Sequence, residues 1–327
     1  HGNGGRYMRE LIHEIFARHL GNPLLDTNSD AAVLPWDAGA GELVFTTDSF
    51  TVQPIEFPGG NIGSLAVHGT TNDLAVAGAI PKYLSLGVIL EEGLDFAVLE
   101  RVVAGIAAAA SEIGVVVAAG DTKVVRRGEG SGIYLNTSGI GVKDPALVLG
   151  IDRIRAGDVV LVSGSVGDHG IAVMLAREQF GLRGDLKSDA ASVLPLTKAL
   201  AVVPGLRFMR DPTRGGLATV THEIVQATGL GVVLREANVP VRDSVRSVCE
   251  MLGYDPYFLA CEGRVVAVVT ADNADRALVA LRSASGGADA AIIGAVREQP
   301  ARVVLETAIG GERVIEELED DPLPRIC

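Results

Sequence analysis

Four aspartates in the first 121 residues stand next to threonine, serine or asparagine, where we expect turns and strand ends: Asp30, Asp48, Asp73 and Asp121. Mg²⁺ requires hard oxygen ligands and usually bridges carboxylates to phosphates. The group is therefore a candidate site for a metal–nucleotide complex. The alternative is that they are ordinary turn and cap aspartates. That explanation is the commoner one for any single aspartate, but four in one half of the chain weaken it.

Two glycine-rich stretches, 163–170 and 211–216, precede predicted helices in the second half of the chain. The first N–H groups of a helix have no partner within it and favour anions. Arg214 lies in the second stretch and has the forked geometry that binds phosphate. Simple turn formation is the alternative for each stretch. We expect structural or surface roles for His169 and His222.

Cys327, the last residue of the sequence, is the third chemical candidate. Residues 316–327 are acidic, contain two prolines and predict a mobile tail. Fully extended, such a tail spans about 40 Å. A thiol on this arm is suited to carrying a covalently bound group between sites, and an idle terminal thiol is the alternative. Nothing follows the cysteine, so a prenylation box is excluded.

Several familiar signatures are absent from the sequence. It contains neither a Gly-x-x-x-x-Gly-Lys-Ser/Thr phosphate loop nor a Gly-x-Gly-x-x-Gly dinucleotide motif. His13 and His19 are six residues apart, so on a helix they lie on different faces. We therefore expect no zinc site of the metalloprotease type.

The composition excludes some partners and compartments. The 28 basic and 41 acidic residues give a net charge of -13, which argues against nucleic acid or an anionic membrane as the main partner. Three cysteines, Cys249, Cys261 and Cys327, fit a reducing compartment. No apolar run is long enough to span a membrane and no export signal is visible, so we expect a cytoplasmic protein. Because the sequence begins with His1, we expect native residues before it.

Alternating strand and helix patterns predict a mixed α/β chain of two domains. Short β-branched runs bounded by glycine predict strands, and periodic apolar spacing predicts helices. The expected strands are 41–47, 114–120, 159–162, 232–234, 264–270 and 291–296, and the expected helices are 6–20, 96–113, 217–227 and 272–285. A boundary near 143–155 gives an N-terminal domain of residues 1–148, a C-terminal domain of 149–315 and a tail of 316–327.

Together these motifs resemble the HypE family of hydrogenase maturation factors, within the aminoimidazole ribonucleotide synthetase (PurM-like) superfamily. The similarity extends over nearly the whole chain and rests on segments 1–6, 28–33, 47–49, 68–75, 120–123 and 211–216. The superfamily shares the aspartate and glycine motifs. The closing Pro324-Arg325-Ile326-Cys327 distinguishes the HypE family from its relatives.

The resemblance implies a fold and a reaction. The fold would be a PurM-like pair of domains: an N-terminal α/β domain that binds ATP and whose sheet meets its twin in a homodimer, and a C-terminal α+β domain. Cys327 would receive a carbamoyl group from the carbamoyltransferase HypF. The protein would then use ATP to dehydrate the S-carboxamide to an S-cyanide. The HypC–HypD complex would accept the cyanide as a ligand of the [NiFe] hydrogenase iron.

The resemblance also implies roles for individual residues. It assigns the metal Mg²⁺ to Asp30, Asp48, Asp73 and Asp121, and the nucleotide to these four with Asn72, Thr122, Lys123 and Arg214. Glu262 would take the proton from nitrogen, with Lys123 assisting and Cys327 carrying the substrate. A structural ion pair is the alternative for Glu262 and Lys123. His68 would shape the loop that carries Asn72 and Asp73.

Other classes remain open from the residues alone. Thiamine monophosphate kinase, selenophosphate synthetase and the purine synthetase share the aspartates, but none of them requires a C-terminal cysteine. A non-catalytic carrier that presents the Cys327 adduct to its partners is the alternative outside the enzymes. ATP consumption distinguishes this carrier from the dehydratase.

Overall fold

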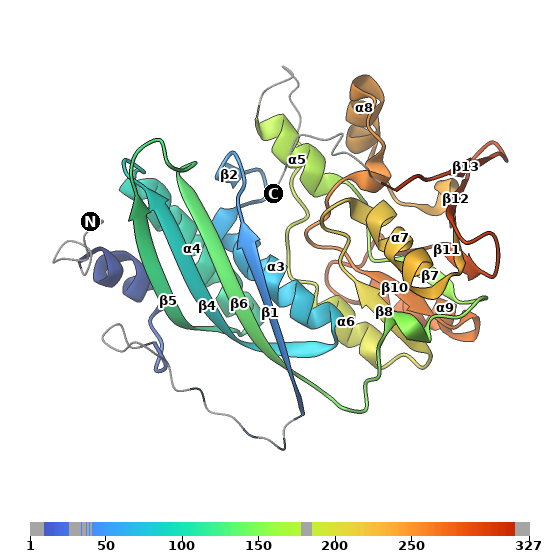
Figure 1. Cartoon of the computed structure of the whole chain (residues 1–327), viewed down its shortest axis with the longest axis horizontal. Coiled ribbons are helices and arrows are strands. Elements are labelled where there is room, and N and C mark those ends of the chain that lie inside the picture. Colours follow the sequence, from blue (N-terminus) through green and yellow to red (C-terminus); the bar gives the residue numbers. More distant parts are fainter. Residues whose placement is uncertain are drawn as a thin grey trace.

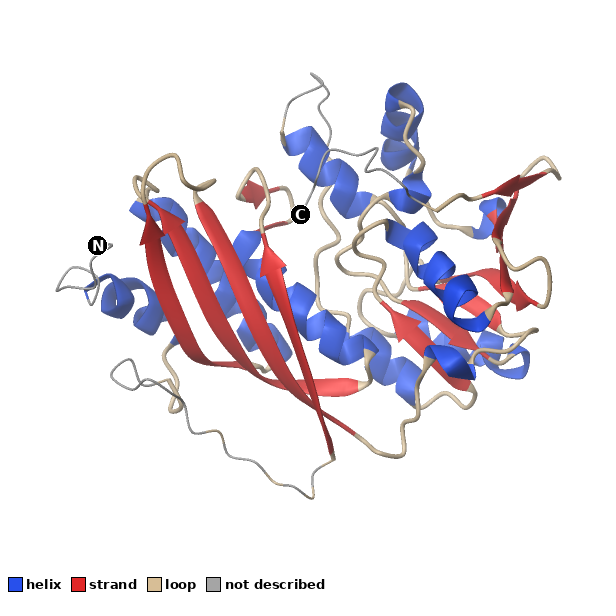
Figure 2. Cartoon of the chain, viewed as in Figure 1, coloured by secondary structure: helices blue, strands red, loops and turns tan. Residues whose placement is uncertain are grey.

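Two β-sheets lie side by side along the long axis of the molecule, each covered by helices (Figures 1 and 2). They are seen in a computed structural model, which describes residues 10–25, 34, 37, 39, 41–177 and 185–317. The expected mixture of strands and helices is confirmed.

The first sheet has four strands in the order β1-β6-β4-β5. Its strands are β1 (Glu42–Phe50), β4 (Ala79–Glu91), β5 (Val116–Val125) and β6 (Ile133–Lys143). β4 and β5 are parallel and the other pairs antiparallel. The parallel pair needs a crossover connection, and helix α4 (Phe96–Ile113) provides it. A small hairpin, β2 (Glu56–Phe57) and β3 (Gly60–Asn61), precedes helix α3 (Ile62–Val76).

Helices α3 and α4 cover one face of this sheet, which we call the inner face, and the outer face carries no helix in Figure 1. α3 begins at Asn61, whose side chain accepts from two backbone N–H groups while Ser64 completes a capping box. Thirteen of its fifteen residues are buried, because it lies between the first sheet and the second half of the chain. A helix that is buried on nearly all sides, with polar and apolar residues mixed around it, has no clear amphipathic period, so periodicity in the sequence does not predict it.

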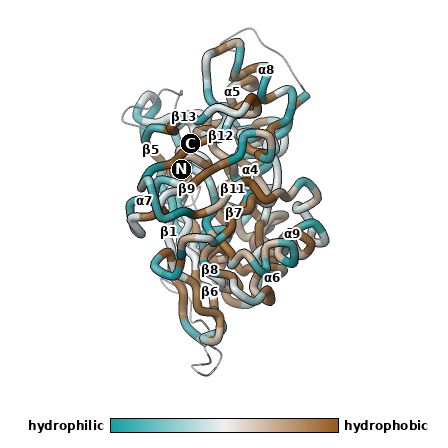
Figure 3. The backbone as a smooth tube through the Cα atoms, turned by 90° about the vertical axis from the view of Figure 1, so that its right-hand side faces the viewer, coloured by the Kyte–Doolittle hydropathy of each residue, from teal (hydrophilic) through white to brown (hydrophobic). Residues whose placement is uncertain are grey.

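The second sheet has seven strands in the order β13-β12-β9-β11-β7-β10-β8, in which only β9 and β12 are parallel. The strands are β7 (Val159–Val162), β8 (Leu206–Arg210), β9 (Gly231–Arg235), β10 (Val266–Val269), β11 (Ala291–Arg297), β12 (Val303–Glu306) and β13 (Glu312–Val314). All four residues of β10 are buried, because helices cover both faces of the sheet. In Figure 3 the tube is brown, the hydrophobic end of the colour scale, at the neighbouring strands β7 and β11.

Helix α7 (Gly216–Thr228) packs on one face of the second sheet, and α6 (Leu194–Ala201) with α9 (Ala274–Ser283) packs on the other. Helices α5 (Asp168–Ala176) and α8 (Asp243–Leu252) share a core with the first sheet and its helices. The short helices are η1 (Ile12–Ala17), α2 (Arg18–Leu20), η2 (Ile151–Arg153), η3 (Glu236–Asn238), η4 (Pro256–Phe258) and η5 (Ala271–Asn273).

Most expected elements are present. The helix at Phe96–Ile113 and the strand at Val159–Val162 have the expected bounds. The expectation that Asp73 lies in a turn and His68 in a loop is wrong, because both are in α3. Asp48 and Asp121 lie inside β1 and β5 rather than at strand ends. In the described part of the chain, no helix is both long enough and apolar enough to cross a membrane.

Candidate functional site

An acidic group lies between the inner face of the first sheet and the second half of the chain. Asp48 points from β1 toward α3, where a Cβ on Gly69 would lie 3.8 Å from its Oδ2. On α3, Asp73 accepts a hydrogen bond from the Thr46 hydroxyl at 3.0 Å. β1 and α3 thus place two carboxylates close to each other.

Asp211 and Glu262 join this acidic group from the second half of the chain. Asp211 follows β8, and Glu262 lies in the loop before β10. Both are buried, with 7% and 6% of the residue exposed. Among the described residues, no hydrogen bond reaches the Glu262 carboxyl, which leaves it free to act on a ligand.

Burial makes these carboxyls weaker acids, and repulsion between them adds to this effect for Asp73, Asp211 and Glu262. Burial, followed by the nearby charge of Asp211, raises the pKa of Glu262 to about 8. Burial, followed by the charge of Asp73, raises the pKa of Asp211 to about 7. Burial also raises the pKa values of Asp48 and Asp73. A group whose pKa lies near neutral pH can accept and release a proton under physiological conditions.

Arg214, just before α7, contributes a positive charge to this site. Burial raises the pKa of Asp48, while the hydrogen bond from the Ser49 N–H and then the positive charge of Arg214 act in the opposite direction. Gly215, which has φ +71°, is the N-cap residue before α7, and no side chain caps the first N–H groups of this helix. An uncapped helix N-terminus beside an arginine is suited to a phosphate group. The sequence-based assignment of Arg214 to phosphate fits this geometry.

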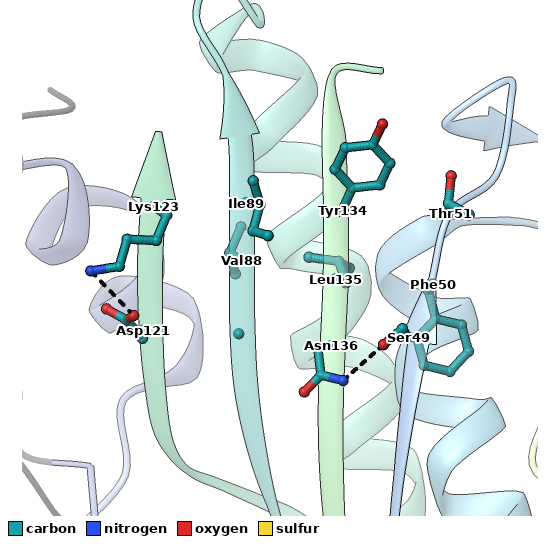
Figure 4. A pocket seen from close by; sticks show the side chains of 11 residues that line it. Ser49, Phe50, Thr51, Val88, Ile89, Asp121, Lys123, Tyr134, Leu135 and Asn136 are labelled. Carbon is teal, nitrogen blue, oxygen red and sulfur yellow. Dashed lines mark hydrogen bonds and ion pairs between the residues drawn. The ribbon is translucent and has the colours of Figure 1, made fainter. Parts of the chain in front are cut away.

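A second group of candidate residues lies on the outer face of the first sheet (Figure 4). Asp121 and Lys123 project from β5 and form an ion pair at 3.7 Å, with both side chains more than 70% exposed. They line a pocket of about 420 Å³ together with residues of β1, β4 and β6. In this pocket the Asn136 amide donates to the Ser49 hydroxyl at 3.0 Å. Thr122 alternates with its neighbours and does not line the pocket.

Within a single chain, the aspartates that we expected in one site lie on opposite faces of the first sheet. Asp121 aligns across β4 and β6 with Ser49, three strands away, which is roughly 14 Å at the usual strand spacing. Ser49 faces the outer pocket, so its neighbour Asp48 faces the opposite side of the sheet. Asp48 and Asp73 therefore lie on the inner face, whereas Asp121 and Lys123 lie on the outer face.

Asn72 is the predicted site residue with the least freedom to bind a ligand. Only 1% of the surface of Asn72 is exposed. Its amide N–H groups donate to the carbonyls of Ala191 and Glu262 at 3.0 and 3.1 Å, and its oxygen accepts from the N–H of Val193 at 2.9 Å. Asn72 thus joins α3 to two loops of the second half of the chain.

Two sequence-based assignments lie outside the described residues, namely Asp30 and Cys327. The sequence reasoning also missed two acidic residues. Asp211 opens the glycine-rich stretch before α7, and its position after a strand was a usable signal. Asp189, whose side chain is 2% exposed, lies in a loop with no recognisable motif.

The donor set fits Mg²⁺ only in company with a nucleotide. Within the described part of the chain, no three His, Cys, Asp or Glu side chains are close enough to hold a metal ion by themselves. Mg²⁺ commonly takes one or two carboxylates and completes its shell with phosphate oxygens and water. Asp48 and Asp73, whose charges repel each other, suit that mode of binding.

Comparison with known proteins gives consistent results. Residues 28–143 match the family model of the N-terminal domain of AIR synthase related proteins, and residues 155–306 match that of the C-terminal domain. The carbamoyl dehydratase HypE of Azotobacter vinelandii is 48% identical, over all of this chain and 96% of that protein.

Solved structures show the same similarity. The hydrogenase maturation protein HypE in complex with ATP has a TM-score of 0.94 and 46% identity, covering 100% of this chain and 98% of that one. HypE in a HypE–HypF complex has a TM-score of 0.82 and 43% identity, covering 94% of this chain and 99% of that one.

Proposed function

The chain belongs to the HypE family of AIR synthase related proteins, and we propose that it is an ATP-dependent carbamoyl dehydratase. One observation carries the proposal: the buried carboxyl of Glu262, with its pKa near 8, lies in an acidic group beside an uncapped helix N-terminus. A base and a phosphate-binding element thus occur together. The ATP bound to a 46% identical relative supports the nucleotide.

The substrate is the S-carboxamide of Cys327 in this proposal. HypF supplies the carbamoyl group, and the solved complex of a relative with HypF supports that partnership. The product is an S-cyanide, which passes to the HypC–HypD complex and becomes a ligand of the [NiFe] hydrogenase iron. The free, buried Cys249 and Cys261 agree with a cytoplasmic location, where thiols stay reduced.

The chemistry requires activation of a poor leaving group. The amide oxygen attacks the γ-phosphate of ATP, ADP leaves, and one N–H proton is released. Loss of the second N–H proton then expels phosphate and forms the C≡N bond. Glu262 accepts a proton from nitrogen, because its carboxyl has no other partner among the described residues and titrates near neutral pH. The N-terminus of α7 and Arg214 hold the phosphates.

Mg²⁺ bound with the nucleotide would supply neutralisation of phosphate charge. Asp48 and Asp73 would hold it from the inner face, with Asp30 as a further ligand. The Asn72 amide is fully hydrogen-bonded to backbone groups and is not available to bind the nucleotide. Asn72 contributes instead by joining α3 to the loops that contain Glu262 and Val193. Residues 1–148 provide most of the nucleotide site, 149–315 provide Glu262 and Arg214, and 316–327 carry the substrate.

A homodimer through the outer face of the first sheet brings the remaining candidates to the site. The outer face exposes large apolar side chains, including Leu43, Phe45 and Ile89 at 57%, 64% and 41%. An exposed apolar face of this kind favours association. Asp121 and Lys123 of a second copy can then reach the edge of β1, whereas Thr122, which alternates with them, faces away from this interface. Their position, far from Asp48 in one chain, supports this arrangement.

Mass spectrometry of the C-terminal peptide tests the function. The full chain is incubated with HypF, carbamoyl phosphate and ATP, with Cys327→Ser as the matched control. We expect Cys327 to gain a carbamoyl group and then to lose one water, with one ATP hydrolysed per cyanated chain. Stable carbamoylation without loss of water or ATP consumption would instead support a carrier that only presents the adduct.

A further inference from the structure

The peptide backbone on both sides of Glu262 is held by two side chains from other segments. The Glu262 N–H donates to Asp189 Oδ1 at 3.1 Å. The Glu262 carbonyl accepts from the Asn72 amide at 3.1 Å. The following residue, Gly263, lies directly against the backbone of Asp189 and Ala191, where a Cβ would clash with the Asp189 carbonyl. This contact leaves little room for the Glu262 loop to move.

Asp189 belongs to a segment that is itself tied to both halves of the chain. We call residues 188–193 the linking segment. The Ser188 N–H donates to the Pro58 carbonyl at 2.8 Å, and its hydroxyl lies 2.8 Å from His169 Nδ1. The Asn72 amide bonds to Ala191 and Val193. These hydrogen bonds hold the linking segment in place, and with it the Asp189 side chain that contacts the Glu262 peptide.

The Asp189 carboxyl also connects Glu262 to a buried ionic group. Its Oδ2 lies 3.3 Å from Arg264 Nε, and Arg264 also pairs with Asp168 at 3.2 Å. Asp168 pairs with Arg242 at 2.9 Å, whose side chain is 51% exposed. Two carboxylates and two guanidinium groups thus balance each other. Asp189 is the member of this group that touches the Glu262 peptide.

We propose that Asp189 is a positioning residue for Glu262: it holds the Glu262 peptide through Oδ1 and places a second acidic side chain near the Glu262 carboxyl. This inference rests on the proposed role of Glu262 as the base. Holding the peptide sets the direction of the carboxyl, and the nearby charge makes the protonated carboxyl more stable. No motif in the sequence singles out Asp189.

The charges that act on the Glu262 carboxyl belong to separate segments of the chain, so each can be removed by itself. Those that raise its pKa are, after burial, Asp211, Asp189, Asp48 and Asp73. They come from the loop after β8, the linking segment, β1 and α3. Asp189 faces Arg264, Asp168 and the Glu262 N–H. Asp168 is buried and pairs with the same Arg264, but within the described part of the chain it makes no hydrogen bond to the Glu262 peptide, which Asp189 holds. It is therefore the matched control.

The experiment compares Asp189→Asn, Asp189→Ala and Asp168→Asn in single-turnover dehydration of carbamoylated full-length protein across pH. Asp189→Ala should lower the dehydration rate by about 10- to 100-fold with the KM for ATP unchanged, because the peptide of the base is released. Asp189→Asn keeps an acceptor for the N–H and should recover most of that rate. Its ascending pH limb should lie about 1 pH unit lower, since a negative charge is gone.

A merely structural Asp189 gives a different result. Both Asp189 variants would then lower the melting temperature, as Asp168→Asn should, with no displacement of the pH limb. That outcome overturns the inference. Titration of the Glu262 carboxyl by ¹³C NMR, in protein free of nucleotide and metal, provides a readout independent of activity. Glu262→Gln identifies the signal, and an equal pKa in wild type and Asp189→Asn also overturns the inference.

The failure of the proposed function looks different from the failure of this inference. If wild-type protein never dehydrates its carbamoylated tail, the function is wrong. If Glu262→Gln dehydrates at the wild-type rate, Glu262 is not the base. In both cases the NMR titration still decides whether Asp189 acts on the Glu262 carboxyl. If Glu262→Gln is inactive and Asp189→Asn has an unshifted limb, only the role of Asp189 is wrong.

Discussion

At the scale of single residues, four carboxyls enclosed between two halves of the chain account for the chemistry that we propose. Burial raises the pKa of all four, Asp48, Asp73, Asp211 and Glu262, and the charges of neighbouring carboxylates raise it further for Asp73, Asp211 and Glu262. Such crowding costs stability when all four are ionised. Binding of a cation or of a proton reduces the repulsion between the carboxylates. A site that binds a metal–nucleotide complex and also contains a base requires carboxyls that respond in this way.

The pH dependence of stability follows from these pKa values. The folded-state pKa of Glu262 rises from 4.5 to about 8 and that of Asp211 from 3.8 to about 7, so the folded protein binds more protons than the unfolded chain in between. Burial lowers the pKa of His68 to about 4 and that of His169 to about 3, and these two groups act in the opposite direction below about pH 6.5. The free energy of unfolding of metal- and nucleotide-free protein should therefore decrease most clearly between about pH 6.5 and about pH 8. Urea denaturation across this range measures it.

The double variant Asp211→Asn/Glu262→Gln should show a flatter pH dependence in the same titration, because the groups that lose protons are gone. Glu223→Gln, a change of a partly exposed carboxyl on α7 that pairs with Arg210, is the control and should leave the slope unchanged. An equal slope in wild type and the double variant would contradict the assignment.

At the scale of elements, the close packing of β1 against α3 determines how near Asp48 and Asp73 lie. Gly69 faces β1 from α3, and a Cβ there would lie 2.7 Å from the ring of Phe50, which is itself buried. Only a glycine lets the helix approach so closely. The same helix carries Asn72, which joins the linking segment and the Glu262 loop. α3 is therefore the element on which both halves of the site depend.

Gly69→Ala should separate β1 from α3. We expect the free energy of unfolding to fall by about 1–3 kcal/mol from overpacking, together with weaker Mg²⁺-dependent ATP binding. Urea denaturation and calorimetric titration with ATP measure the two effects. Phe50→Leu removes ring atoms at the contact, so adding it to Gly69→Ala should restore part of both losses. If Gly69→Ala alone has the stability and ATP affinity of the wild type, the close packing of α3 against β1 does not determine the geometry of the site.

At the scale of the whole molecule, the nucleotide-site candidates are divided between the two faces of one sheet. Asp48 and Asp73 are on the inner face, and Asp121 and Lys123 are on the outer face at the far edge. The symmetric dimer that we propose would offer each copy the residues that it lacks, because an isologous interface presents the same surface twice. The outer pocket shown in Figure 4 then becomes part of an interface rather than an isolated cavity.

Complementation tests the shared site. Homodimers of Asp48→Asn and of Asp121→Asn should each bind Mg-ATP about 10-fold or more weakly. A mixed dimer, purified through two different tags, combines the intact Asp48 of one chain with the intact Asp121 of the other in one of its two sites. We expect about half of the wild-type dehydration capacity. A mixed dimer as defective as its parents would show that both aspartates act within one chain.

Local patterns were sufficient for much of the fold. The alanine-rich run at Phe96–Ile113 and the valine run at Val159–Val162 follow from periodicity and β-branching, which depend on neighbours in the chain. Helix α3 does not follow from periodicity, because a helix buried on nearly all sides shows no periodic pattern of apolar residues. Asp73 was accordingly placed in a turn, although it lies on that helix.

The sequence by itself determined the family, the mixed α/β class and the identity of Asp48, Asp73, Arg214 and Glu262 as candidate site residues, because residue types and their order carry this information. Only the tertiary structure decided which of them meet. It placed Asp121 on the opposite face from Asp48, joined the Asn72 amide to the backbone and brought Asp189 to the Glu262 peptide. The physical reason is distance along the chain: Asp189 and Glu262 are 73 residues apart, and strand order and packing alone bring them together.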